Sequence, residues 1–327
     1  MVSGIGSFPF TDVDEAIDII FETCPEIPFW PQLPKRAPYE NMYIPFLEGI
    51  PCVVVNENEG SAIMDTENAE GIEEFYDNVQ GGNLEAFQIS EKVAPGFYRF
   101  LDRLRERTSA VRFIKTQITG PFSMGLGLKD ETGKAVIYNY GYFDIIKKAI
   151  HMKAQWMIAT IKGQFPDKGI IIFFDEPYMV SFGSAYVSIS REEAVGIFND
   201  VLGDIPGIRG IHCCGNTDWS VLLNAQVDII NYDAFNYLDT IFYFDDDLRR
   251  FIKGGGRIAP GIVPSSEEVM KATPKDMEHL MEKFQSLMID KVGPEGLQNL
   301  IVTTSCGVGS LQPEHAKKAM ELLKTFG

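Results

Sequence analysis

The sequence has 327 residues, 45% of them apolar, and a net charge of −17 at pH 7. This length and composition suit one large domain with an extensive core. The acidic charge would repel a nucleic-acid backbone, and no apolar run reaches the length of a membrane span, so we expect neither partner. The N-terminus has no basic segment followed by an apolar one, and the five cysteines are odd in number, so a cytoplasmic protein is expected.

Eight short segments rich in β-branched and aromatic residues predict strands, and amphipathic patterns between them predict helices. Strands that alternate with helices predict a parallel sheet, and eight such units predict a single (β/α)8 barrel over residues 1–327. Long loops are expected after the first and second strands. A doubly wound open sheet is the alternative, although no GxGxxG follows the first strand. The expected strands are residues 3–7, 51–56, 111–117, 169–175, 207–214, 227–233, 256–261 and 300–306, and the expected helices are 12–24, 94–107, 143–165, 191–202, 265–273, 274–292 and 313–325.

The ends of the fifth and eighth expected strands carry side chains that suit a metal. Side chains alternate along a strand, so His212 and Cys214 point to one side and offer an imidazole and a thiolate. Cys306 adds a second thiolate on the same rim. Zinc accepts nitrogen, sulfur and oxygen ligands, so we expect these three residues to bind Zn²⁺, with Asp233, water or a substrate thiol as the fourth ligand. Burial in the core is the alternative interpretation for the histidine and the cysteines.

Two other strand ends carry candidate substrate-binding residues. Asp175 closes the fourth expected strand, where its carboxylate could hold an ammonium group or form an ion pair at the rim. Gly6 and Ser7 close the first strand. Gly6 permits close approach of a backbone, and Ser7 could bind a carboxylate through its N–H or hydroxyl group. An ordinary strand-to-turn junction is the alternative for this pair.

Together these motifs resemble the catalytic C-terminal barrel of cobalamin-independent methionine synthase, in the superfamily that also holds uroporphyrinogen decarboxylase. The resemblance implies that His212, Cys214 and Cys306 are zinc ligands. It also implies that Ser7 binds the amino-acid end of homocysteine and that Asp175 contacts its amine, so that these residues form a catalytic site. The matching segments lie across most of the chain and are residues 5–9 (IGSFP), 119–121 (TGP), 175–177 (DEP), 212–214 (HCC), 260–262 (PGI) and 306–307 (CG).

The chain departs from this family in three places. Asp233 stands where the family has a glutamate zinc ligand, and it is shorter by one methylene group. The family's second amine-binding carboxylate corresponds to Glu57 or Glu59, and we take Glu57 as the candidate. The sequence predicts one barrel, whereas the full-length family enzyme has two. The chain therefore resembles the short core-type enzymes and the methylcobamide:thiol methyltransferases.

The resemblance implies a zinc-dependent methyltransferase that moves a methyl group to a thiol, with homocysteine as the expected acceptor and methionine as the product. The expected donor is a methyl-corrinoid, carried by a corrinoid protein as partner, or methyltetrahydrofolate. The alternatives are a methylcobamide:thiol methyltransferase with another thiol acceptor, a lyase like uroporphyrinogen decarboxylase, and a non-catalytic metal- or corrinoid-binding partner protein.

Overall fold

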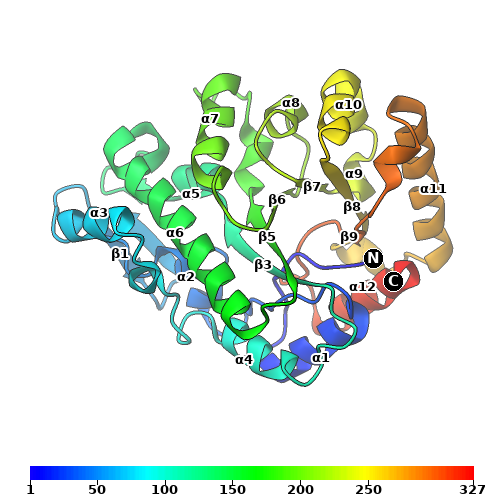
Figure 1. The fold of residues 1–327 in the computed structure, drawn as a ribbon, viewed down its shortest axis with the longest axis horizontal. Coiled ribbons are helices and arrows are strands. Elements are labelled where there is room, and N and C mark those ends of the chain that lie inside the picture. The colour runs from blue at the N-terminus through cyan, green and yellow to red at the C-terminus, as the bar shows by residue number, and fades with distance from the viewer.

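A curled sheet of six parallel strands forms the centre of the computed structural model, which describes all residues from 1 to 327 (Figure 1). The strands lie side by side in chain order, as expected when each strand is followed by a helical crossover. Five of these strands overlap the predicted ranges closely, and the last is much shorter than predicted. The strands are β3 (Phe113–Thr119), β5 (Gly169–Asp175), β6 (Ile208–Cys213), β7 (Ile229–Tyr232), β8 (Arg257–Val263) and β9 (Thr303–Thr304).

Twelve α-helices complete this mixed α/β fold, and several of them cover the outer face of the sheet (Figure 1). Local signals explain where helices begin: Ser190 caps α7 in a reciprocal capping box with Glu193, and Asp12 caps α1. The predicted helix at 265–273 is only a 3-10 turn, Glu267–Met270. The helices are α1 (Val13–Thr23), α2 (Ile44–Leu47), α3 (Ile72–Gln80), α4 (Pro95–Leu104), α5 (Pro121–Gly127), α6 (Tyr140–Gln164), α7 (Arg191–Leu202), α8 (Trp219–Leu223), α9 (Ala234–Tyr237), α10 (Asp245–Lys253), α11 (Pro274–Lys291) and α12 (Pro313–Leu323).

The inner face of the curled sheet is apolar near the amino ends of the strands and polar near their carboxyl ends. Every second residue of a strand faces inward, so Asp175, His212 and Asn231 follow the apolar residues on the same face. A larger apolar cluster fills the space between the sheet and the helices. The polar side chains therefore lie above a layer of buried apolar side chains, which we call the floor. The floor is a small separate cluster of buried residues, Ile27, Ile171, Phe173, Ile229, Ala259 and Ile301.

Two extended segments, residues 2–7 and 29–32, lie beyond the two edge strands of the sheet. Single parallel bridges link the first segment to the strand β9 region, the two segments to each other, and the second segment to β3. The two chain termini lie near each other beside β9 and α12 (Figure 1). The bridges are Val2 with Val302, Ser7 with Gln32, and Phe29 with Lys115.

The prediction that residues 51–56 form the second strand of the central sheet was wrong. Val53–Asn56 forms β1, which pairs with β2 (Ser61–Met64) in a separate three-stranded sheet that also contains β4 (Lys129–Asp130). A run of valines predicts a strand but does not say which sheet the strand joins. The segment beside β3 is residues 29–32 instead. Prolines at 28 and 31 obscure its strand pattern in the sequence, because proline has no N–H group to donate to a neighbouring strand.

This difference also changes where the long connection lies. The first segment, residues 2–7, is followed by α1 and then directly by residues 29–32. The long connection, residues 33–112, comes after that second segment and contains α2, β1, β2, α3 and α4. No helix combines the length and the hydropathy that a bilayer crossing requires.

Candidate metal centre

Three of the predicted ligands come together at the carboxyl ends of the strands. His212 lies in β6, Cys214 directly follows that strand, and Cys306 follows β9. Their ligand atoms, one imidazole nitrogen and two sulfurs, all lie within 4.8 Å of one another. One imidazole and two thiols at this separation can bind a single ion, and this donor set fits Zn²⁺.

A chain of hydrogen bonds determines which nitrogen of His212 is free. Asn231 of β7 lies opposite His212 in register, and Nδ1 of His212 is 2.5 Å from Oδ1 of Asn231. The Asn231 amide is oriented by its Nδ2, which donates to the carbonyl of Ala259 and the hydroxyl of Thr303. Oδ1 can only accept, so Nδ1 carries the proton and Nε2 keeps its lone pair. Nε2 is buried without a hydrogen-bond partner, as a metal-binding imidazole requires.

The protonation states of the cluster also suit a cation. Burial lowers the pKa of His212 to about 4, so the imidazole is neutral at pH 7. A hydrogen bond between the two thiols lowers the pKa of Cys214 and raises that of Cys306, because one proton is held between them. Neither cysteine forms a disulfide. The cluster therefore offers a neutral nitrogen and a readily formed thiolate.

Asp233, the predicted fourth ligand, is not part of this cluster. Its Oδ1 accepts a hydrogen bond from the backbone N–H of Asn236 at 2.9 Å, and its Oδ2 accepts from Nδ2 of the same residue at 2.7 Å. Asp233 is thus the N-cap of α9. Both carboxylate oxygens are engaged locally, which explains why the shorter side chain stays with its own helix.

Asp175 ends β5 directly beside His212, its partner in register. Burial raises the pKa of Asp175 to about 7, and the ammonium group of Lys115 opposes that rise. Lys115 is buried on the inner face, where its Nζ donates to the carbonyl of Ile5 at 3.2 Å and lies 4.6 Å from the ring centroid of Phe173. Oδ1 of Asp175 has no partner. This oxygen is free to accept a hydrogen bond from a ligand.

Ser7 and Gly6 lie at the other side of the inner face, against the loop that carries Cys306. A Cβ added at Gly307 would come within 2.1 Å of Oγ of Ser7, so the glycine after Cys306 permits this close approach. Gly6 has a φ of +139°, and a Cβ there would lie 2.7 Å from Nε2 of Gln117. Both the backbone angle and the space therefore require glycine at position 6.

Glu57, the predicted second amine-binding residue, lies at the protein surface. It follows β1 in the turn before β2, and its Oε1 is 2.6 Å from Nζ of Lys92. The two side chains are 48% and 57% exposed. This is a solvent-exposed ion pair, a kind of contact that contributes little to stability because water screens it.

Three residues of the site were missed in the sequence: Asn231, Lys115 and Glu176. Glu176 is fully buried, and its carboxylate accepts from the backbone N–H groups of Phe122 at 3.0 Å and Ser123 at 2.7 Å. Burial raises the pKa of Glu176 to about 8. A usable signal was present, because Asn231 is the one amide side chain of its strand and Lys115 is the one charged side chain of its strand. Such residues need a buried partner.

The fold and the cluster place the protein among α/β proteins that have a curled parallel sheet and an imidazole–thiol site at the carboxyl ends of its strands. No protein-family model matches the chain, and no curated protein matches it. A methyltransferase from Methanosarcina mazei has a TM-score of 0.58 at 12% identity, over 99% of this chain and 92% of that one. This likeness shows a shared fold.

A second solved structure is that of a B12-independent methionine synthase from Shewanella sp. W3-18-1 in complex with selenomethionine. Its TM-score is 0.49 at 18% identity, over 70% of this chain. The present chain spans 64% of the length of that synthase chain.

Proposed function

We propose that the protein is a zinc-dependent methyltransferase that methylates a thiol. The observation that carries the proposal is the cluster of His212, Cys214 and Cys306, in which Nε2 of the histidine has no partner. Bound Zn²⁺ would lower the pKa of a neighbouring substrate thiol, so that the nucleophilic thiolate forms near neutral pH. The structure that shares this fold is described as a methyltransferase, and we extend that activity to this chain as part of the proposal.

The residues around the cluster have separate roles in this proposal. Asn231 orients the His212 ring, so that Nε2 is the nitrogen available to the ion. Asp175 offers its free Oδ1 to a hydrogen-bond donor of the substrate, and Ser7 stands beside the Cys306 loop. The apolar floor excludes water from below. Holding two reactants in line in such a site supplies much of the rate of a methyl transfer.

Homocysteine is the first acceptor to test, because Asp175 suits an ammonium group. The surface pairing of Glu57 with Lys92 removes the second predicted carboxylate, so other thiols belong in the same test. For the donor we propose a methyl-corrinoid on a partner protein, with methyltetrahydrofolate as the alternative. Exposed apolar side chains on the connection after β5, Val180 and Tyr186, support a docking surface for such a partner.

We also propose that the central sheet is a closed (β/α)8 barrel. The three single parallel bridges through residues 2–7 and 29–32 support this closure, because they run from β9 round to β3. With these two segments the sheet would have eight members. Closure would bring residues 2–7 and Cys306 to adjacent positions on one rim.

Zinc content and methyl transfer, measured on the same samples, test the proposal. We expect about one zinc per chain in the wild type and a loss of zinc in His212→Ala, Cys214→Ser and Cys306→Ser. Cys213→Ala is the matched control, because Cys213 neighbours both ligands in sequence but is buried on the opposite face. Methylcobalamin with a panel of thiols should give methyl transfer that needs zinc. Full zinc retention in all three ligand variants would contradict the proposal.

A further inference from the structure

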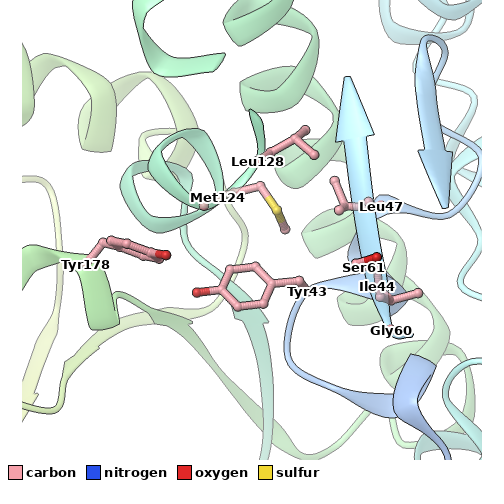
Figure 2. A pocket seen from close by; sticks show the side chains of 10 residues that line it. Tyr43, Ile44, Leu47, Gly60, Ser61, Met124, Leu128 and Tyr178 are labelled. Carbon is pink, nitrogen blue, oxygen red and sulfur yellow. The ribbon is translucent and has the colours of Figure 1, made fainter. Parts of the chain in front are cut away.

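An apolar pocket of about 180 Å³ lies between α2, the β1–β2 hairpin, α5 and the turn after β5 (Figure 2). Leu47, Met124 and Leu128 form its apolar walls, and Tyr43 and Tyr178 stand on one side with their hydroxyl groups toward each other (Figure 2). No lysine, arginine or histidine lines it. A charged group would find no opposite charge in this pocket, so its burial would be unfavourable. An apolar group would exchange contact with water for contact with apolar side chains, which is favourable.

The pocket lies on the same side of the sheet as the rim that carries the metal-ligand cluster, at a distance of about two strands. The carbonyl of Met42, next to Tyr43, accepts a hydrogen bond from the hydroxyl of Thr119. Thr119 lies opposite Asp175 in register, and Asp175 lies opposite His212. Adjacent strands are about 4.8 Å apart, so the pocket begins about two strands from the cluster.

Electrostatics agree with this placement. Burial raises the pKa of the Tyr43 phenol well above its usual value, and negative charge on Tyr178, Glu176, Cys214 and Asp175 adds to that rise. These charges reach Tyr43 only because the ring stands near the site. The backbone N–H of Tyr178 in turn donates to Oγ of Ser123 at 3.0 Å, which fixes the other aromatic wall.

The size of the pocket selects the group that fits. A dry cavity of about 150 Å³ binds benzene, so a pocket of about 180 Å³ holds a phenyl ring or a branched chain of about six carbon atoms. Met124 lies at its centre in Figure 2, and a thioether makes favourable contacts with aromatic rings. Gly127 keeps the space open, because a Cβ there would already lie 3.3 Å from the Tyr43 ring.

We propose that the acceptor is a thiol that carries an apolar group of about six heavy atoms at the end of a chain of about four carbon atoms. The apolar group sits in this pocket, and the chain lets the sulfur reach the His212–Cys214–Cys306 cluster. This assignment rests on the proposed methyl transfer and names its acceptor class. In the step, the thiol proton leaves to solvent and the thiolate electron pair forms the S–CH₃ bond. With methylcobalamin as donor, the Co–C bond breaks heterolytically, and its electron pair stays on cobalt as Co(I).

Two probes separate the pocket from the reaction. 4-Phenylbutane-1-thiol is the acceptor probe, because its four-carbon chain spans the distance of about two strands between the pocket and the cluster. Benzyl alcohol has the same phenyl ring without the thiol, so its binding in saturation-transfer NMR needs no methyl transfer. Ala62→Phe fills the pocket from β2, and Ile63→Phe is the control, because the next side chain of the strand points the other way and is 45% exposed. Thermal melts and circular dichroism establish that both variants fold.

We expect benzyl alcohol to bind the wild type and Ile63→Phe equally, and to bind Ala62→Phe at least 10-fold more weakly. Methylcobalamin should methylate 4-phenylbutane-1-thiol with a kcat/KM on the order of 30-fold above that for 2-mercaptoethanol, since burial of a ring favours the larger thiol. In Ala62→Phe the KM for 4-phenylbutane-1-thiol should rise about 10-fold while the KM for methylcobalamin is unchanged. If Ala62→Phe fails to fold, competitive inhibition of 4-phenylbutane-1-thiol turnover by benzyl alcohol in the wild type takes its place.

Several outcomes would overturn the inference. Equal binding of benzyl alcohol to Ala62→Phe and the wild type places the ring elsewhere. A rise in the KM for methylcobalamin alone assigns the pocket to the donor instead. Methylation of homocysteine without any binding of benzyl alcohol refutes the pocket assignment and leaves the proposed function standing. Binding of benzyl alcohol without methylation of any thiol refutes the proposed function, and with it the acceptor.

Discussion

Asn231 offers a sharp test of the metal centre, because it touches the cluster only through His212. Its Oδ1 accepts from Nδ1 of the histidine at 2.5 Å, and its Nδ2 donates to Ala259 and Thr303 at 2.6 and 2.8 Å. Asn231→Leu keeps a similar volume but removes all three bonds. Loss of such an orienting partner typically lowers metal affinity about 10–100-fold, or about 1.4–2.7 kcal/mol.

Asn231→Asp separates orientation of the imidazole from stability of the fold. A carboxylate still accepts from Nδ1 of His212, so zinc affinity should stay close to that of the wild type. It cannot donate to Ala259 and Thr303, so the free energy of unfolding should fall by about 1–3 kcal/mol for each acceptor left buried without a partner. Asn231→Leu should lower both the free energy of unfolding and the affinity for zinc.

Competition with a chromophoric zinc chelator measures both affinities on folded protein. Thr116→Val is the control, because it removes the buried hydrogen bond from Trp30 without touching His212. It should lower stability and leave zinc affinity unchanged. If Asn231→Leu binds zinc as tightly as the wild type, the hydrogen bond from His212 to Asn231 does not set the tautomer that binds the ion.

Three further predictions concern metal linkage and the buried charges. Zinc at about 100 times its Kd should raise the Tm of the 327-residue chain by about 4 °C in differential scanning fluorimetry, and Cys306→Ser should abolish the shift. Burial raises the pKa of Glu176 to about 8, so its contribution to stability is complete below pH 4.5 and is lost as the pH rises through 8. Glu176→Gln should therefore flatten the fall in Tm between about pH 5 and 8, and an unchanged slope would contradict this. Lys115→Met removes the cation that opposes the burial of Asp175, so the pKa of Asp175 should rise above about 7, and the protonated carboxyl band in the infrared spectrum should persist to higher pH. An unchanged midpoint of the Asp175 titration in Lys115→Met would show that the charge of Lys115 does not affect the pKa of this carboxyl group.

The sequence predicts best where the chain is buried on both faces. Residues 169–175 are a continuous apolar run between clear breaks, and they form β5 with those bounds. The helix predicted at 191–202 has the bounds of α7, and its start is fixed locally by the capping box of Ser190 and Glu193. Such signals lie within a few neighbouring residues, so no tertiary contact is needed to interpret them.

The errors come from contacts between distant segments. Residues 53–56 have a strong strand pattern but pair within their own hairpin, while residues 29–32, with a proline among them, lie beside β3. Only the packing of the whole chain decides between these two segments. The same holds for Asn231, because its partners His212, Ala259 and Thr303 come from three other strands. Asp233 was predicted as a ligand by its position, and the local Asn236 contact uses its carboxylate instead.

Zinc K-edge absorption spectroscopy, before and after addition of the acceptor thiol, tests whether the His212–Cys214–Cys306 cluster binds the ion and the thiol together. We expect one nitrogen and two sulfur donors in the resting protein, from His212, Cys214 and Cys306. On addition of 4-phenylbutane-1-thiol a third sulfur should join at about 2.3 Å, with no donor lost from the protein. A sulfur shell that is the same with and without the thiol would contradict the proposal that this cluster activates the acceptor.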